Sequence, residues 1–108
     1  MIDEKFRLAL GGFLEKWQAT IRKWNLSYMI LASPTLQFKK GKRYVKITKI
    51  ERNATGGSVE AFINMSTGDI FKSASCNAPA KHARGNVFSE YNGMEAIDQA
   101  GYVKYRRN

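Results

Sequence analysis

The sequence has very few of the side chains on which most catalytic and metal sites depend. Its 108 residues include one cysteine, Cys76, and one histidine, His82. A single cysteine excludes an intrachain disulfide and is typical of a reducing compartment, so we expect a cytoplasmic protein. One Cys and one His supply fewer than the three or four ligands of a zinc site, and their spacing matches no familiar nucleophile–base pair. We therefore predict no metal and no other cofactor.

Long apolar runs and phosphate-binding glycine loops are also absent. The chain has no run of about 18 apolar residues that could span a membrane. Its acidic start, MIDEKFRL, lacks the basic and apolar parts of a secretory signal. Neither GxxxxGK[ST] nor GxGxxG occurs, and the carboxylates are scattered rather than paired. These absences predict a protein that is neither an enzyme nor bound to membranes.

Acidic residues are scarce relative to basic ones. Nine Asp and Glu residues stand against 18 Lys and Arg residues, which leaves a formal net charge of +9. Such an excess attracts polyanions and opposes self-association of a small domain. With 44% apolar residues the chain can fold, so the charge belongs to a folded surface. Nucleic acid is the first partner that this charge suggests.

The first quarter of the chain has helical periodicity. Apolar side chains recur along one helical face of residues 3–25, from Phe6 to Trp24. We expect this face, including its tryptophans, to pack in the core rather than to serve as a platform for bases. Gly11 and Gly12 weaken the middle of the helix and could kink it or delay its start.

The apolar period changes to two after Phe38. Three segments with β-branched residues, joined by short turns that contain glycine, predict an antiparallel meander within residues 38–75. The predicted strands are residues 44–52, 58–64 and 70–75. Together with the helix they predict one α+β domain, residues 1–108, in which the N-terminal amphipathic helix packs on the meander.

The remaining segments have weaker patterns. Residues 28–31 suggest a short strand or a buried extended segment, which Pro34 ends. From residue 76 onward we expect a loop, then a short helix over residues 94–100 and a C-terminal strand or tail.

Basic residues concentrate in KKGKRYVKITKIER, residues 39–52. The segment carries seven cations and one acid, Glu51, which is a net +6. If a strand begins at Tyr44, then Tyr44 and Lys46 lie on one face and Lys49 on the other. A ring beside an ammonium group is what sheets use to bind unpaired bases and phosphates. The alternative is an edge strand charged against aggregation, which requires fewer like charges.

The segment NAPAKHARGN, residues 77–86, surrounds basic residues with small ones. Its alanines and glycine would let a phosphate approach the backbone, with Lys81 and Arg84 as donors. Alternatively, the segment only turns the chain, and Arg84 pairs with Glu90 or Asp69. The pattern leaves both interpretations open.

Aromatic side chains complete the candidate contacts. Phe62 and Phe71 lie on predicted strands and are expected to be buried. Tyrosine hydroxyls tolerate solvent, so Tyr44, Tyr102 and Tyr105 are better candidates for stacking. The predicted nucleic-acid contacts are Lys39, Lys40, Lys42, Arg43, Tyr44, Lys46, Lys49, Lys72, Lys81, Arg84, Tyr102, Lys104 and Arg106.

One stretch resembles a motif of small uncharacterised phage-encoded proteins. TGDIFKSASCNAPAKHARGN, residues 67–86, is similar to T-G-D-[IV]-x-K-x-A-S-W-x-A-P-A-K-x-x-R-G-N, which follows a strand like residues 44–50. Cys76 stands where that motif has tryptophan. The resemblance implies a phage origin and agrees with the helix-plus-sheet folds of phage proteins that bind single-stranded DNA.

We therefore expect a non-enzymatic protein that binds nucleic acid, with single-stranded DNA favoured over RNA or duplex. Two other functions stay open. The protein could dock on an acidic host or phage protein, steered by the same charge, or it could be a structural component of a virion. Self-association as a dimer or larger oligomer through an exposed sheet edge also stays open.

Overall fold

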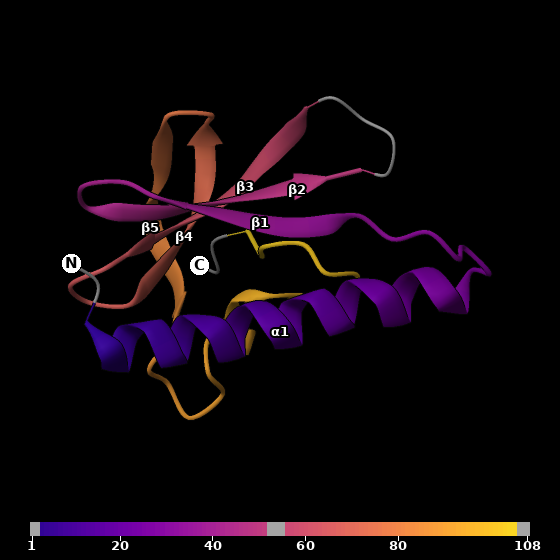
Figure 1. Cartoon of the computed structure of the whole chain (residues 1–108), viewed down its shortest axis with the longest axis horizontal. Helices are drawn as coiled ribbons and strands as arrows, with labels where there is room; N and C mark the ends of the chain where they lie inside the picture. Colours follow the sequence, from indigo (N-terminus) through magenta and orange to yellow (C-terminus); the bar gives the residue numbers. More distant parts are fainter. Residues whose placement is uncertain (1–2, 52–55, 106–108) are drawn as a thin grey trace.

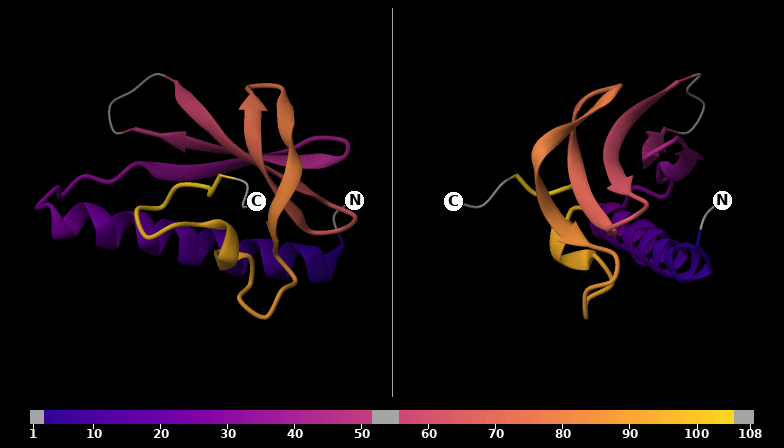
Figure 2. Two further views of the ribbon diagram at one scale, coloured as in Figure 1. Left: turned by 180° about the vertical axis from the view of Figure 1, so that it is seen from behind. Right: turned by 90° about the vertical axis from the view of Figure 1, so that its left-hand side faces the viewer.

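The computed structural model describes residues 3–51 and 56–105 and consists of one helix packed on a five-stranded sheet (Figure 1). The elements in chain order are α1 (Glu4–Ser27), β1 (Thr35–Lys40), β2 (Tyr44–Ile50), β3 (Gly57–Asn64), β4 (Asp69–Ser75), β5 (Ala78–Asn86) and the short 3₁₀-helix η1 (Met94–Ala96). All neighbouring strands are antiparallel, in the order β1-β2-β3-β4-β5. The predicted α+β class, with a helix on an antiparallel meander, is confirmed (Figure 2).

The helix buries the predicted face from Phe6 to Ile21, but Trp24, which was predicted to pack in the core, is only partly buried and lies outside it. The Asp3 carboxylate caps α1 by accepting a hydrogen bond from the Lys5 backbone amide. The helix is continuous through Gly11 and Gly12, so it neither starts late nor breaks there. A Cβ at Gly12 would lie 2.5 Å from the Asn92 side chain, so this glycine makes room for the C-terminal part of the chain. The buried residues of α1 are Phe6, Leu10, Phe13, Trp17 and Ile21.

The core lies between α1 and one face of the sheet. Trp17 is fully buried, and its indole N–H donates to the Gly101 carbonyl at 2.7 Å, so its one polar group is satisfied. In the described part of the chain, no buried side-chain polar atom lacks a hydrogen-bond partner. The sheet and the C-terminal part contribute Val45, Ile47, Ala61, Ile63, Ile70, Val87, Ala96, Ile97 and Val103 to this core.

The sheet has two strands more than the sequence predicts. The three predicted strands correspond to β2 and β3, which bury alternate side chains in the core, and β4, which buries Ile70 there. β1 is missing from the prediction because its residues are mostly exposed and only Leu36 and Phe38 alternate as apolar residues. β5 lies in the segment predicted as a loop, and that prediction is wrong. Its small residues pair with β4 through a ladder broken by bulges, so it lacks a strand-like pattern.

Residues 28–31 are neither a strand nor buried, contrary to the prediction. The helix ends in a Schellman motif, in which the Met29 amide donates to the Leu26 carbonyl and the Ile30 amide to the Asn25 carbonyl, both at 2.9 Å. Met29 has a φ of 60°, and the turn that it forms projects away from the sheet. Apolar residues are usually buried, which explains why the sequence misleads here.

The C-terminal part packs against the sheet edge and α1 with little regular structure. The helix predicted over residues 94–100 is a single turn, because Ile97 is already extended. The predicted C-terminal strand is reduced to one antiparallel bridge between Ile97 and Val103. Arg106 lies outside the described residues. Within them, no helix is both long and apolar enough to cross a membrane.

Candidate nucleic-acid interface

The sheet face turned away from the core carries a row of cations and rings. Lys39 of β1 pairs with Lys46 of β2, which pairs with Phe62 of β3, which in turn pairs with Phe71 of β4. Residues directly opposite one another on antiparallel strands share a face. The neighbours of Lys46 within β2 are core residues, so alternation places this row on the opposite, outer face.

Tyr44 completes an aromatic cluster on this outer face. Its ring centroid lies 5.9 Å from that of Phe62 and 6.1 Å from that of Phe71, both edge to face. The ammonium group of Lys46 lies 6.0 Å from the Phe62 centroid. Phe62 is only 4% exposed, so its predicted burial is confirmed, although it lies outside the core cluster. Tyr44 retains ring surface that a base can reach, since it is only half-buried.

Phe71 is not buried, contrary to the prediction from the sequence. It is half-buried on the outer face beside Tyr44. The signal was available, because Phe71 follows the core residue Ile70 and must therefore point to the other side of β4. It is a second ring that a ligand on this face can contact.

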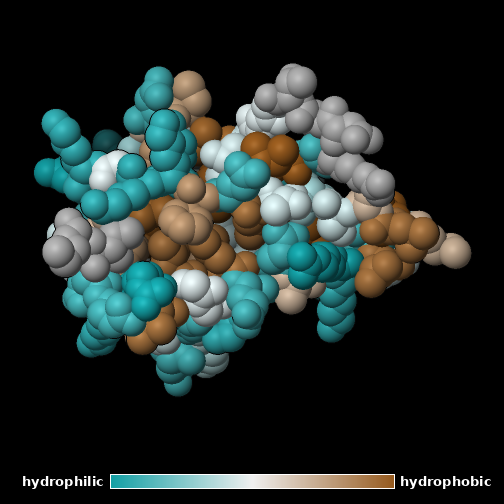
Figure 3. Space-filling model, viewed as in Figure 1, coloured by the Kyte–Doolittle hydropathy of each residue, from teal (hydrophilic) through white to brown (hydrophobic). Residues whose placement is uncertain are grey.

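A groove beside the β1–β2 hairpin is lined by the rings of Tyr44 and Phe62 and by a group of cations. Its volume is about 260 Å³, and both strands and the turn between them form its walls. Hydrophilic side chains gather at this end of the molecule (Figure 3). We call it the basic groove, and its lining residues are Lys39, Lys40, Gly41, Lys42, Arg43, Tyr44, Lys46 and Phe62. The structure thus brings together six of the predicted contacts.

Among the residues that the structure describes, no acid forms an ion pair with the cations of the basic groove. The sequence between Thr35 and Ile50 contains no Asp or Glu. In the part of the chain that the structure describes, the sole ion pair joins Arg7 to Glu4 on α1, where hydrogen bonding and the charge of Glu4 raise the pKa of the Arg7 guanidinium. Lys39 and Lys46 face each other directly, and like charges in such positions destabilise a sheet. A bound anion would relieve this repulsion.

Two other predicted contacts hold the C-terminal segment instead. The Lys72 ammonium group donates to the Val103 carbonyl at 3.1 Å, and Nε of Arg84 donates to the Lys104 carbonyl at 3.1 Å. A second nitrogen of Arg84 donates to the carbonyl of His82. The alternative in which Arg84 pairs with Glu90 or Asp69 is not observed, because Arg84 donates to these backbone carbonyls instead. Both cations therefore have a structural task.

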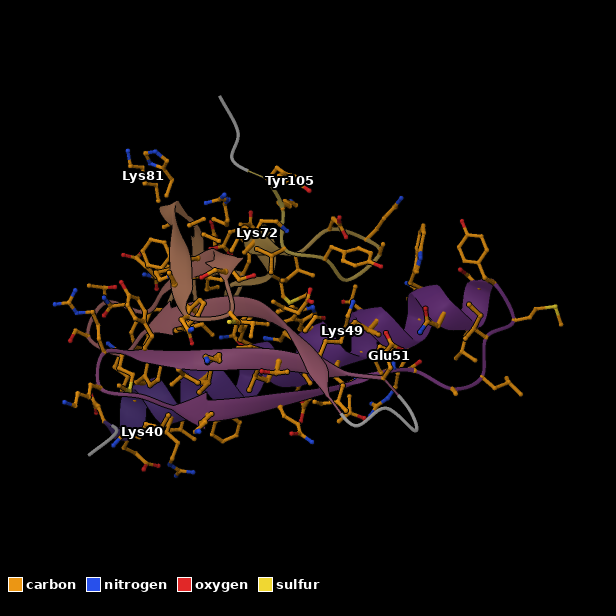
Figure 4. The ribbon with its side chains drawn as sticks, turned by 90° about the horizontal axis from the view of Figure 1, so that it is seen from above. Lys40, Lys49, Glu51, Lys72, Lys81 and Tyr105 are labelled. Carbon is orange, nitrogen blue, oxygen red and sulfur yellow. The ribbon has the colours of Figure 1, made fainter. Side chains whose placement is uncertain are left out.

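The tyrosines of the C-terminal segment lie under lysines from the sheet. The Lys49 ammonium group is 4.4 Å from the Tyr102 ring centroid, and that of Lys72 is 4.7 Å from the Tyr105 centroid. Both tyrosines remain exposed, as predicted. Figure 4 shows that Lys72 and Tyr105 lie far from Lys40, toward the opposite edge of the sheet. These rings are therefore separate from the basic groove.

Two predicted contacts stand alone. Lys81 is exposed on β5, across the sheet from the basic groove (Figure 4). Lys104 is exposed near the end of the described chain, and its carbonyl accepts a hydrogen bond from Arg84.

Cys76 is a free, exposed thiol in the β4–β5 turn. Among the described residues, no three His, Cys, Asp or Glu side chains gather as metal ligands.

Residues 67–86 form the β4–β5 hairpin, and their polar side chains support it. The Asn86 amide donates to the Asp69 carboxylate at 3.0 Å. A Cβ on Gly85 would lie 2.9 Å from Glu95, so this glycine allows close packing of η1. The backbone of the segment pairs with β4. Residues 78–86 are therefore an edge strand rather than the predicted loop, and phosphate binding by this segment stays a prediction.

Comparison with known proteins gives a family but no activity. The model of a family described as "Family of unknown function (DUF7717)" matches residues 13–106, which include all five strands and most of α1. No curated protein matches the chain, and no solved structure does. The chain therefore belongs to the family of unknown function DUF7717.

Proposed function

We propose that this protein binds single-stranded nucleic acid, with DNA as the first candidate, and that it catalyses no reaction. The observation that carries the proposal is the basic groove, where five cations without acidic partners adjoin the partly open ring of Tyr44. Phosphates would contact the cations, and an unpaired base would stack on the ring. A duplex keeps its bases stacked inside, so it would use only the cations.

The order of groups across the sheet supports this mode of binding. Lysines occupy β1 and β2, and rings occupy β3 and β4 along the same cross-strand row. At the usual spacing of about 4.8 Å between strands, the row from Lys39 to Phe71 spans roughly 14 Å. A strand of nucleic acid that follows the lysines therefore has its bases beside Tyr44 and Phe71. We expect a short site that contacts a few nucleotides.

An acidic protein is the main rival ligand. It would meet the same cations and would be steered by the same charge. It would have no need of the aromatic wall of the groove, because carboxylates bind ammonium and guanidinium groups without stacking. The rings beside the lysines therefore favour nucleic acid.

The test is a titration of nuclease-treated protein against fluorescent oligonucleotides of one sequence, as single-stranded DNA, single-stranded RNA and duplex DNA. We expect both single strands to bind more tightly than the duplex. Affinity for single-stranded DNA should fall with salt, with a log–log slope of up to about −3.5 if all five cations contact phosphates. No binding at low salt, or equal affinity for all three ligands, would contradict the proposal. A stoichiometric acidic protein that stays bound after nuclease treatment would favour the rival.

A further inference from the structure

The end of the molecule opposite the basic groove exposes large apolar side chains. They belong to the end of α1 and the turn that follows it, which we call the apolar tip: Leu26, Tyr28, Met29, Ile30 and Leu31. Met29 is 87% exposed and Leu31 86%. Hydrophobic surface occupies this extremity in Figure 3. Taking about 150–250 Å² for a large side chain, the tip exposes on the order of 600 Å², the size at which patches on monomers are often functional.

Met29 holds a backbone conformation that methionine disfavours. Its φ of 60° is left-handed, and it occupies the position after the helix cap where glycine or asparagine is usual. A side chain with a Cβ is strained there. Within a single copy the Met29 side chain contributes almost no packing, because it is almost entirely exposed to solvent. A partner that buries the side chain would account for it.

Hollows lie directly beside these projecting side chains. One, of about 390 Å³, is lined by Thr20, Lys23, Trp24, Ser27 and Gln99. Another, of about 220 Å³, lies on the other side of Trp24 and includes Ile30, Pro34 and Tyr102. A two-fold interface requires one patch to fit itself, with projections and hollows on the same surface. The apolar tip and its surroundings meet that requirement.

The charges around the apolar tip fit a second copy better than a lipid surface. The rim carries both signs, with Lys23 and Lys49 against Glu51. Figure 4 shows Lys49 and Glu51 together, far from Lys40. A two-fold rotation can bring such opposite charges together, whereas binding to an anionic bilayer favours a rim that is basic throughout. Contact between tips also separates the two basic grooves, because each molecule is 38 Å long.

We propose that the apolar tips of two copies pack against each other across a two-fold axis to form a homodimer. Met29 and Leu31 of each copy enter the hollows beside Trp24 of the other. The two basic grooves then face outward at opposite ends of the dimer. This inference does not depend on the proposed function, since the tip and the basic groove share no residue.

Sedimentation velocity of nuclease-treated protein, over a range of concentrations at moderate salt, tests the dimer. We expect a concentration-dependent monomer–dimer equilibrium for the wild type. The double variant Met29→Asp with Leu31→Asp should raise the dimer dissociation constant at least tenfold, because each copy would bury carboxylates. Leu8→Asp, which adds one carboxylate, is the control, since Leu8 is exposed near the other end of α1, and it should dimerise like the wild type.

Three results would overturn the proposal. The first is a wild type that stays monomeric at every concentration. The second is a double variant that dimerises as strongly as the wild type. The third is a monomeric wild type that co-floats with anionic vesicles through the tip, which would identify a membrane as the partner.

Met29→Asn keeps the proposal falsifiable if the double variant fails to fold. Asparagine tolerates the left-handed conformation but removes the projecting thioether. We expect the dissociation constant to rise severalfold while the melting temperature of the monomer rises by a few degrees. A dimer of unchanged affinity in this variant would also overturn the proposal.

Discussion

The two basic regions of this protein use similar side chains for different purposes. In the basic groove, lysines and an arginine lie side by side with no acid near them in the sequence. At the other side of the sheet, Lys72 and Arg84 donate to carbonyls of the C-terminal segment. Charge alone does not distinguish the two regions. The difference is whether a segment of the chain supplies acceptors for the cations.

Because of this difference, the loss of a cation should have opposite effects on stability in the two regions. A side chain that donates to a backbone carbonyl stabilises the fold, because removing it leaves that carbonyl without its partner. A cation that faces another cation, as Lys39 faces Lys46, destabilises the fold slightly and gains from an anionic ligand. Variants in the first region should therefore change stability, and variants in the second should change binding.

The largest expected effect is that of removing the facing lysines. Lys39→Gln with Lys46→Gln should lower affinity for single-stranded DNA at low salt at least tenfold. The salt slope should become shallower by about 1.4, because each lost phosphate contact removes about 0.7 for single strands. The melting temperature should stay the same or rise, since the repulsion between the two lysines is removed. Fluorescence anisotropy and thermal unfolding measure these three quantities.

A double variant of equal charge separates a local site from diffuse attraction. Lys23→Gln with Lys81→Gln changes net charge by the same amount at exposed positions away from the basic groove. It should lose less than twofold in affinity. Equal losses in the two double variants would show that binding follows net charge, and the basic groove would then have no special role.

An intermediate effect, on stability rather than binding, is expected at Arg84. Arg84→Gln should lower the free energy of unfolding by about 1–2 kcal/mol, because a charge-assisted hydrogen bond to the Lys104 carbonyl is lost at a half-buried position. This corresponds to a fall in melting temperature of roughly 4–16 °C. Arg84→Lys retains the charge but not the geometry, so it should lose part of this stability. Affinity for single-stranded DNA should stay within twofold in both variants. A larger loss would indicate that Arg84 contacts nucleic acid directly.

The fold is predictable where a segment buries one face. The helical spacing from Phe6 to Ile21 and the alternation of β2 and β3 both reflect contact with the core, so periodicity reveals them. The edge strands β1 and β5 bury little and depend on pairing with a neighbour. β1 has only Leu36 and Phe38 as alternating apolar residues, and β5 consists mostly of small and basic ones, so their periodic signal is too weak to reveal a strand.

The candidate site also has features that the sequence predicts and features that it does not. Alternation within one strand is enough to place Tyr44 and Lys46 on a common face. The opposition of Lys39 and Lys46 requires the register of β1, a strand that the sequence does not reveal. The structural task of Lys72 and Arg84 is invisible in the sequence, because their acceptors are backbone carbonyls, which every residue possesses.

The smallest expected effect on affinity is that of removing a single ring, tested with one tyrosine from each basic region. Tyr44→Leu should weaken binding of single-stranded DNA about fivefold, since stacking on one base contributes on the order of 1 kcal/mol. Tyr44→Phe should bind like the wild type, because it keeps the ring. Tyr102→Leu removes a ring that is more exposed than Tyr44 but lies outside the basic groove, so affinity should not change. If Tyr102→Leu weakened binding as much as Tyr44→Leu does, the nucleic acid would have to cross both regions, and the distinction between free and engaged cations would fail.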